Sequence, residues 1–134
     1  MNAETTDYLA KARAALADAR RIATLPLAHI AAREAYLAVF HAAEAFIFER
    51  TGRIAKTHRG VRTEFARLAR TEARITPELA RFLTVAYEFK DQADYAVGPR
   101  LAAVSQADAE AAMAMAARFI DVLAEVLGAA PPAA

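Results

Sequence analysis

The chain has 134 residues, the length of one ordinary domain, which is enough to bury a single hydrophobic core. It contains no cysteine, and this excludes disulfides, thiolate catalysis and cysteine-based metal sites. The net charge of +1 excludes a global field that would draw the protein to nucleic acid or to an anionic membrane. With 57% hydrophobic residues, four glycines and five prolines, the composition predicts a few long helices and no sheet.

The amino terminus predicts a cytoplasmic protein. Residues 1–7 lack the basic stretch and apolar run of a secretory signal. The longest apolar stretch, residues 35–48, is interrupted by His41 and Glu44 and is too short to cross a bilayer. We therefore expect a cytoplasmic location and no contact with a membrane.

The first predicted helix begins near Thr6 or Asp7, two residue types that often cap helices, and runs to about Ala23. Apolar residues recur along it at helical spacing, which predicts one buried face. That face carries Leu9, Ala12, Leu16 and Ala19. Pro26 ends the pattern, because proline forces the residue before it out of the helical region.

The second predicted helix, from about Ala28 to Arg50, is apolar around most of its circumference, which is typical of a central helix. Its polar residues fall within about a quarter turn when each residue advances by about 100°. This polar stripe consists of Arg33, Glu34, His41 and Glu44. The stripe can face solvent, form the floor of a cleft or contact a second subunit, and the sequence leaves all three open.

A basic connection leads into the third helix, which is predicted from about Arg59 to Thr71 with Thr57 or His58 at its cap. A helix N-terminus presents free backbone donors and a partial positive charge, so this segment predicts a phosphate-binding site. A histidine there can act as a general acid or base in phosphodiester cleavage. The alternative is a solvated loop with a histidine near a cap. The basic connection comprises Arg53, Lys56, His58, Arg59 and Arg62.

Thr76-Pro77-Glu78 is the clearest helix start in the chain, because it supplies an N-cap residue, a proline at the first helical position and an acid that suits the helix dipole. The fourth predicted helix runs from there to Gly98-Pro99. Its apolar residues recur at helical spacing and predict a core-facing side. They are Leu79, Phe82, Leu83, Ala86, Phe89 and Ala93.

The fifth predicted helix covers about Gln106 to Leu127 and ends at Gly128. Its apolar face carries Ala109, Met113, Ala116, Ile120, Leu123 and Leu127. We expect a single helical domain over residues 1–128 and a disordered Ala/Pro tail over residues 129–134. Five helices with short connections predict an all-α, five-helix up-and-down bundle.

Polar and aromatic side chains gather at the end of the fourth helix. Lys90 and Asp94 lie four residues apart and can form an ion pair. Tyr87, Asp91 and Tyr95 lie beside them. The segment is either a salt-bridged helix end with packing tyrosines or the border of a cleft.

No motif of a familiar enzyme class is present. The sequence lacks a P-loop, a dinucleotide-binding fingerprint and a nucleophile elbow. Its three histidines, His29, His41 and His58, lack metal-binding spacing, and the His41/Glu44 pair has no Glu-x-x-His partner of the kind a di-metal bundle uses. We therefore expect no metal site and no cofactor.

Three short segments carry a resemblance to a known family. They are AREAYLAVFHAA at residues 32–43, KTHRGV at residues 56–61 and YEFKDQADY at residues 87–95. In this order and spacing they resemble small bacterial HEPN-domain proteins, and the similarity extends from about Leu9 to Leu127. The resemblance implies an up-and-down helical bundle that is usually a homodimer. Such proteins are often encoded beside a minimal nucleotidyltransferase, as the toxin of a toxin-antitoxin pair.

The resemblance also implies where a site would lie. Active members of the family are ribonucleases that carry an arginine and, four to six residues later, a histidine on the helix equivalent to the fourth helix here, at the dimer cleft. In this chain Lys90 stands in place of the arginine, and Asp94-Tyr95 stands where the histidine would be. An arginine followed after four residues by a histidine does occur at Arg53 and His58, but it lies in a loop.

The main hypothesis is a HEPN-type toxin component that binds RNA or a nucleotide at a dimer cleft. If it is a metal-independent ribonuclease, His58 moves the protons and Lys90 stabilises charge. One alternative is a non-catalytic interaction module that contacts a nucleotidyltransferase through the polar stripe and its apolar flanks. Another is that Tyr95 accepts a nucleotide from that transferase. The predicted site residues are Arg33, Lys56, His58, Lys90, Asp94 and Tyr95.

Overall fold

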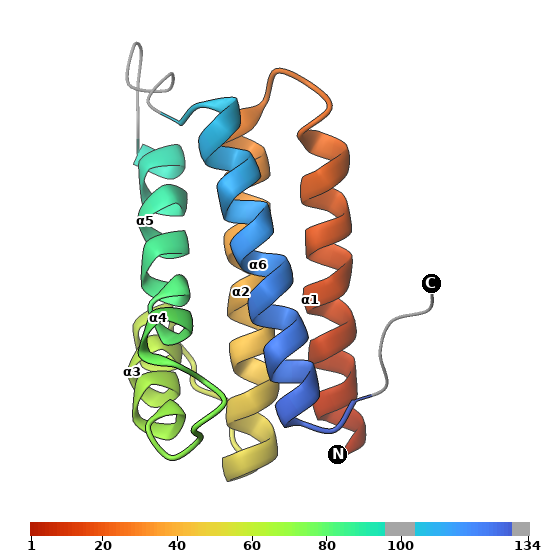
Figure 1. The fold of residues 1–134 in the computed structure, drawn as a ribbon, viewed down its shortest axis with the longest axis vertical. Helices are drawn as coiled ribbons and strands as arrows, with labels where there is room; N and C mark the ends of the chain where they lie inside the picture. The colour runs from red at the N-terminus through yellow and green to blue at the C-terminus, as the bar shows by residue number, and fades with distance from the viewer. Residues whose placement is uncertain (96–103, 130–134) are drawn as a thin grey trace.

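The computed structural model describes residues 1–95 and 104–129, and every regular element in these ranges is an α-helix (Figure 1). Along the long axis of the molecule, α1, α2, α5 and α6 alternate in direction, while α3 and α4 lie together at one end beside α5. This arrangement confirms the predicted all-α up-and-down bundle. The helices are α1 (Ala3–Ile22), α2 (Ala28–Thr51), α3 (His58–Ala69), α4 (Pro77–Ala80), α5 (Phe82–Tyr95) and α6 (Gln106–Val126).

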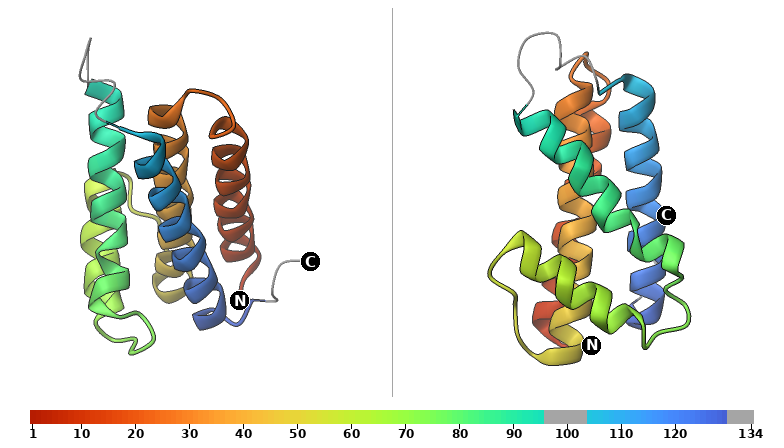
Figure 2. Two further views of the ribbon diagram at one scale, coloured as in Figure 1. Left: turned by 45° about the horizontal axis from the view of Figure 1, so that its top comes forward. Right: turned by 90° about the vertical axis from the view of Figure 1, so that its left-hand side faces the viewer.

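The central helix is α2, because α1, α3, α5 and α6 all pack against it. Figure 2 shows α1 and α5 on opposite sides of α2. Small side chains allow helices to approach closely, and several alanines of α2 are fully buried. They include Ala35, Ala38, Ala42 and Ala45. The apolar circumference of this segment therefore correctly predicted its central position.

Three phenylalanines fix the position of α3 within the bundle. Phe65 of α3 packs edge-on against Phe46 of α2, with ring centroids 5.6 Å apart. On its other side the Phe65 ring lies 5.3 Å from that of Phe119 on α6. All three rings are buried. The core thereby holds α3 beside α2 and α6.

The first helix begins one turn earlier than predicted. Its N-cap is Asn2, whose Oδ1 accepts the backbone N–H of Thr5 at 2.8 Å. Glu49 of α2 accepts hydrogen bonds from the backbone nitrogen of Asn2 at 3.0 Å and from Thr5 Oγ1 at 2.8 Å. The predicted start near Thr6 or Asp7 is wrong, because Asn2, also a residue type that often caps helices, caps the helix earlier and the contact with α2 holds the extra turn.

The predicted start of the fourth helix is confirmed, but the helix is divided. Thr76 Oγ1 accepts the N–H of Leu79 at 3.1 Å, and Pro77 lies in the first turn of α4. The helix is interrupted at Arg81, after which α5 begins. On the predicted core side, Leu79, Leu83 and Ala86 are buried and Phe82 and Phe89 are partly buried. The Ala93 side chain and Gly98-Pro99 lie outside what the structure describes.

A capping box of Ser105 and Asp108 begins α6. Most of its predicted face is buried, including Ala109, Ala116, Ile120 and Leu123. Gly128 follows with a φ of 73°, the left-handed conformation that commonly ends helices. Residues 130–134 of the expected tail lie outside the described ranges. None of the described helices combines the length and apolarity that a bilayer span needs.

Candidate functional site

Thr57 places His58 at the first position of α3. The Oγ1 of Thr57 accepts the N–H of Gly60 at 2.9 Å, which confirms Thr57 as the cap. A Cβ atom at Gly60 would lie only 2.9 Å from that Oγ1, so glycine leaves room for the cap. The first turn of α3 therefore holds His58 at a defined point beside α2.

The His58 side chain lies against two aromatic residues of α2. Its Nδ1 is 2.5 Å from Tyr36 Oη, a hydrogen bond, and its ring stacks on Phe40 with centroids 4.4 Å apart. Tyr36 and Phe40 are buried, whereas His58 is exposed. Because Tyr36 engages Nδ1, Nε2 is the ring nitrogen left for a ligand.

Arg62 and Tyr87 extend this group to α5. The guanidinium carbon of Arg62 lies 3.9 Å from the centroid of the Tyr87 ring, a cation–π contact. Tyr87 in turn packs edge-on against Tyr36, with centroids 5.6 Å apart. Nη1 of Arg62 is buried with no hydrogen-bond partner among the described residues, so an anion that reached it would complete its hydrogen bonding. We call these five residues the His58 cluster: Tyr36, Phe40, His58, Arg62 and Tyr87.

The surroundings of His58 lower the pKa of its imidazole below the ordinary value of 6.5. Partial burial of the ring is the main cause, and the charges of Lys90 and Arg62 add to it while that of Glu44 opposes it. Burial also raises the pKa of the Tyr36 hydroxyl to about 12, although the charge of Arg62 counteracts part of the rise. At neutral pH the hydrogen bond therefore joins an uncharged imidazole to an uncharged phenol.

An ion-paired group lies next to the cluster. Lys90 Nζ is 2.6 Å from Asp94 Oδ2, which confirms the predicted pair four residues apart. Arg33 Nε of α2 lies 3.3 Å from the other carboxylate oxygen of Asp94. The hydrogen bond with Asp94 raises the pKa of the Lys90 ammonium. Asp94 therefore links α5 to α2 and offsets part of the positive charge beside His58.

The structure brings some of the predicted site residues together and leaves others at the edge. Lys90 is close enough for its charge to affect His58, and Asp94 joins Lys90 to Arg33. Tyr95 ends α5 and is 74% exposed, and Lys56 lies exposed two residues before His58. The role of these residues stays a prediction.

The polar stripe of α2 is largely half-buried. His41 Nδ1 lies 2.7 Å from Glu44 Oε1, and the two side chains are only 13% and 11% exposed. These two groups therefore satisfy each other. In the part of the chain that the structure describes, no three histidine or acidic side chains are grouped so that they could hold a metal ion.

Sequence reasoning did not assign Tyr36 or Phe40 to the site, and it named Tyr87 only as a neighbour of Lys90 and Asp94 at a helix end that could border a cleft. Tyr36 and Phe40 belong to the apolar circumference that the sequence predicts for the second helix. Their four-residue spacing places them on one face of that helix, and this was the signal available. The contacts with His58 and Tyr87 join three helices, so only the folded chain reveals them.

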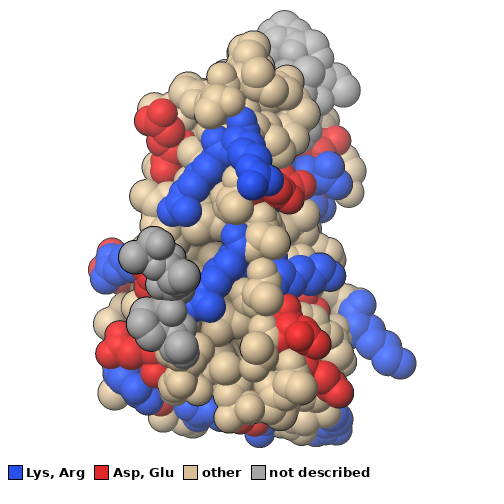
Figure 3. Space-filling view, turned by 90° about the vertical axis from the view of Figure 1, so that its right-hand side faces the viewer, with Lys and Arg blue, Asp and Glu red and all other residues tan. Residues whose placement is uncertain are grey.

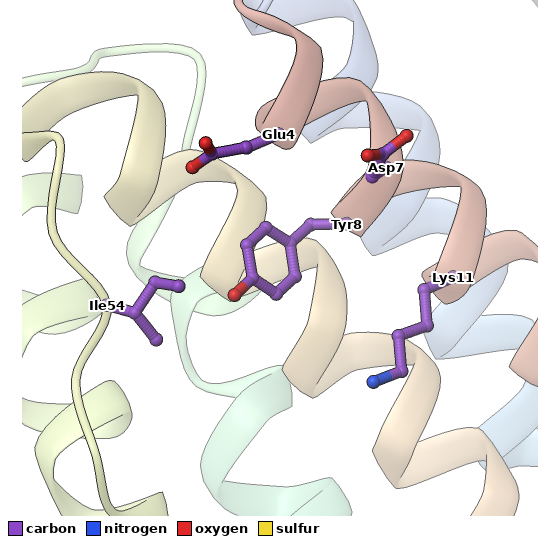
Figure 4. Close-up of a pocket in the computed structure, with 5 residues that line it drawn as sticks. All are labelled: Glu4, Asp7, Tyr8, Lys11 and Ile54. Atoms are coloured by element: carbon purple, nitrogen blue, oxygen red, sulfur yellow. The ribbon is translucent and has the colours of Figure 1, made fainter.

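A separate groove lies between α1 and the connection before α3 (Figure 4). Its volume is about 370 Å³, and Figure 4 shows the Tyr8 ring reaching from α1 toward Ile54. Ile54 is 46% exposed. The groove thus combines apolar, acidic and basic groups. It is lined by Glu4, Asp7, Tyr8, Lys11 and Ile54.

Comparisons with known proteins agree with this fold. The model of the HEPN domain family matches residues 5–127. The crystal structure of TT1696 from Thermus thermophilus is similar, with a TM-score of 0.76 and 22% sequence identity over 93% of this chain and 98% of that chain. At this identity the likeness shows the fold alone. No curated protein matches the chain.

Proposed function

This chain belongs to the HEPN domain family, and we propose that it binds RNA or a nucleotide at the His58 cluster as the toxin of a toxin-antitoxin pair. One observation carries the proposal. An uncharged imidazole stacks on Phe40 and bonds to Tyr36, with the cations of Arg62 and Lys90 close by. The exposed imidazole with cations beside it suits a nucleotide, whose base can contact the imidazole and whose phosphate can contact the cations.

The reaction that we propose is RNA cleavage without a metal. When the imidazole proton of His58 lies on Nδ1 and is donated to Tyr36 Oη, Nε2 can take the proton of a ribose 2′-hydroxyl. The 2′-oxygen bonds to the adjacent phosphorus, and the 5′-oxygen leaves with the electron pair of the broken bond and gains a proton. The products are a 2′,3′-cyclic phosphate and a 5′-hydroxyl. Arg62 and Lys90 stabilise the negative charge that develops on the phosphoryl oxygens.

Binding and cleavage are tested separately with a fluorescein-labelled single-stranded RNA, by anisotropy and by gel electrophoresis. His58→Ala should abolish cleavage and leave binding nearly unchanged. Arg62→Ala should weaken binding about tenfold or more, the usual effect of losing a charge-assisted hydrogen bond. His29→Ala, outside the cluster, is the matched control and should change neither. Cleavage that survives His58→Ala rules out this proton-transfer role.

The toxin role and its partner are tested in cells. Expression of the chain should arrest growth, and co-expression of the nucleotidyltransferase from the adjacent reading frame should relieve the arrest. The His58→Ala variant should not arrest growth even when it accumulates to the same level. Equal arrest by the variant and the wild type would contradict the proposed mechanism.

We also propose that the protein is a homodimer in which the polar stripe of α2 faces the second copy. Leu37 lies among the stripe residues at about 100° per residue and is partly exposed. Light scattering should give twice the mass of the chain, and Leu37→Glu should give one chain mass with an unchanged circular dichroism spectrum. A wild-type monomer at all concentrations would contradict the proposal.

The groove in Figure 4 favours a second candidate function, a non-catalytic module that contacts a nucleotidyltransferase. In this groove the exposed Ile54 lies with Tyr8 and charged side chains that a partner protein could contact. Under this alternative the chain neither arrests growth nor binds RNA, and Ile54→Asp abolishes its binding to the transferase. Loss of RNA cleavage in His58→Ala would decide against it.

Tyr95 is the residue that we propose for nucleotide transfer. It is 74% exposed, whereas Tyr36 is fully buried. Incubation with the transferase and ATP should add a nucleotide mass that maps to Tyr95 and is absent from Tyr95→Phe. An unchanged mass in the wild type would exclude this modification.

A further inference from the structure

The RNA cleavage proposed for the His58 cluster needs an acid as well as a base. His58 takes the proton of the 2′-hydroxyl, but the 5′-oxygen that leaves must itself gain a proton. The groups already assigned are poor donors at neutral pH. Burial raises the pKa of Tyr36 to about 12, and the hydrogen bond with Asp94 raises the pKa of Lys90. The guanidinium of Arg62 keeps its protons, so the acid has to be a different side chain.

His41 and Glu44 form a half-buried pair that meets the cluster through Phe40. His41 Nδ1 lies 2.7 Å from Glu44 Oε1, and the two side chains are 13% and 11% exposed. The Phe40 ring stacks on His58 with centroids 4.4 Å apart, and it also packs edge-on against His41 with centroids 5.6 Å apart. Two imidazoles from different helices therefore contact one aromatic ring.

The pair and His58 also interact electrostatically. Burial and two nearby cations lower the pKa of His58. The carboxylate of Glu44 raises this pKa and a charge on His41 lowers it further, so both groups lie within electrostatic reach of the His58 ring. The partners of the two imidazoles differ, because Nδ1 of His58 bonds to an uncharged phenol and Nδ1 of His41 bonds to a carboxylate. This difference suits His58 to take a proton and His41 to give one.

We propose that His41, oriented by Glu44, is the general acid of this cleavage, an inference that rests on the proposed function. As the 2′-oxygen bonds to phosphorus, the bond from phosphorus to the 5′-oxygen breaks and its electron pair stays on that oxygen. The 5′-oxygen then receives the Nε2 proton of the His41 imidazolium. Exchange with water returns a proton to His41 and removes one from His58. Glu44 is a positioning residue, because it holds Nδ1 of His41 and leaves Nε2 for the departing oxygen.

An RNA with sulfur in place of one bridging 5′-oxygen distinguishes the acid from the base. The sulfur leaves as a thiolate, which needs no proton because thiols are much stronger acids than alcohols. His41→Ala should slow cleavage of the all-oxygen RNA about a hundredfold or more and cleave the sulfur-bridged RNA at close to the wild-type rate. His58→Ala should fail on both substrates, because the 2′-hydroxyl proton still has to be removed.

Further variants separate the chemistry from structure and from charge. Glu44→Gln should slow cleavage of the all-oxygen RNA about tenfold or more, and the sulfur-bridged RNA should restore its rate. His41→Gln should behave as His41→Ala does, and its side-chain amide can still donate a hydrogen bond to Glu44 if the alanine variant does not fold. Figure 3 shows lysine and arginine atoms gathered on the side of the molecule where α1 lies. Arg20→Ala on that helix removes an exposed positive charge, and at saturating RNA it should change neither rate.

The outcomes separate this inference from the proposed function. The inference is overturned if the sulfur-bridged RNA fails to restore the rate of a folded His41 variant, or if that variant cleaves the all-oxygen RNA as fast as the wild type does. In both cases wild-type cleavage that is lost in His58→Ala leaves the proposed function standing. A wild-type chain that cleaves neither RNA overturns both.

Discussion

The hydrogen bond between Tyr36 and His58 joins the interior of α2 to the surface of α3. Tyr36 is fully buried, yet its hydroxyl oxygen lies 2.5 Å from an imidazole that is exposed on its other side. The Phe40 ring stacks against one face of the imidazole. The orientation of the ring is therefore determined by side chains that the solvent does not reach.

Tyr36→Phe tests whether the Tyr36 hydroxyl orients the His58 imidazole. The phenylalanine retains the ring packing and removes Oη, and His58 can turn to water instead, so we expect a cost of about 1 kcal/mol in urea unfolding. The ¹⁵N shifts of the imidazole should change, because the proton is redistributed between Nδ1 and Nε2. Tyr87→Phe is the control and should leave these shifts as they are. Unchanged shifts in Tyr36→Phe would show that the hydrogen bond does not set the tautomer.

Lys90→Met tests the electrostatic surroundings of His58. Methionine removes the charge that helps to lower the pKa of His58, so the pKa should rise toward 6.5 in an NMR titration. In the wild type the folded-state pKa lies below the unfolded value. The stabilisation from His58 is therefore full above pH 6.5 and is lost as the pH falls through the folded-state pKa. Lys11→Met on α1 should not move the pKa, and a downward shift in Lys90→Met would contradict the assignment.

At the scale of elements, the turn into α3 couples a cap to a glycine. Thr57 Oγ1 accepts the N–H of Gly60 and leaves only 2.9 Å for a Cβ there. The bond satisfies a backbone donor of the first turn, and it requires a residue without a side chain at the third helical position. The first turn of the helix that carries His58 therefore depends on Thr57 and Gly60 together.

A double-mutant cycle measures this coupling. Thr57→Ala should cost about 1 kcal/mol through loss of the cap. Gly60→Ala alone should give no stabilisation, because the new Cβ pushes against Oγ1. In the Thr57→Ala background the same Gly60→Ala change should stabilise by about 1 kcal/mol, the usual preference for alanine over glycine in a helix. Additive effects in urea unfolding would show that the two residues do not interact.

At the scale of the whole molecule, the core decides where the site residues stand. Phe65 contacts Phe46 and Phe119, so one ring on α3 joins it to two long helices. The buried alanines of α2 allow the other helices to approach that helix closely. His58, Tyr36 and Tyr87, which come from three helices, meet because these contacts set the distances between their backbones.

Phe65→Ala should cost about 3–5 kcal/mol, since it removes a buried aromatic side chain and leaves a cavity. Hydrogen exchange should show the largest loss of protection in α3, and the RNA binding that we propose should weaken because His58 loses its fixed position. Phe82→Ala, which removes a partly buried ring of α5, should cost clearly less. Equal costs for the two substitutions would contradict the central place of Phe65.

Much of the fold followed from local patterns. The spacing of apolar residues located the long helices, and Thr57, Thr76 and Gly128 marked ends that the structure confirms. The start of α1 and the interruption at Arg81 were not predicted. In the first case the local signal was Asn2, which caps Thr5, and a carboxylate 44 residues from Thr5 adds a hydrogen bond that no local pattern reveals.

Among the residues around His58, Lys90 and Asp94 were named from the sequence, whereas Tyr36 and Phe40 were not. Lys90 and Asp94 are neighbours on one helix, so their pairing could be read from spacing. In the sequence, Tyr36 cannot be distinguished from the other core residues of the second helix. Its hydrogen bond with His58 forms only because the first turn of α3 packs against α2. Arg62 and Tyr87 likewise meet only when α3 and α5 pack together.

The sequence by itself determined that this chain is a helical bundle around an apolar second helix, because helix propensity and 3.6-residue periodicity act within a few residues. Only the tertiary structure decided which side chains surround His58 and which guanidinium nitrogens are left without a partner among the described residues. Burial, the pKa of an imidazole and the pairing of a buried donor depend on groups from several helices. They become defined only when those helices pack.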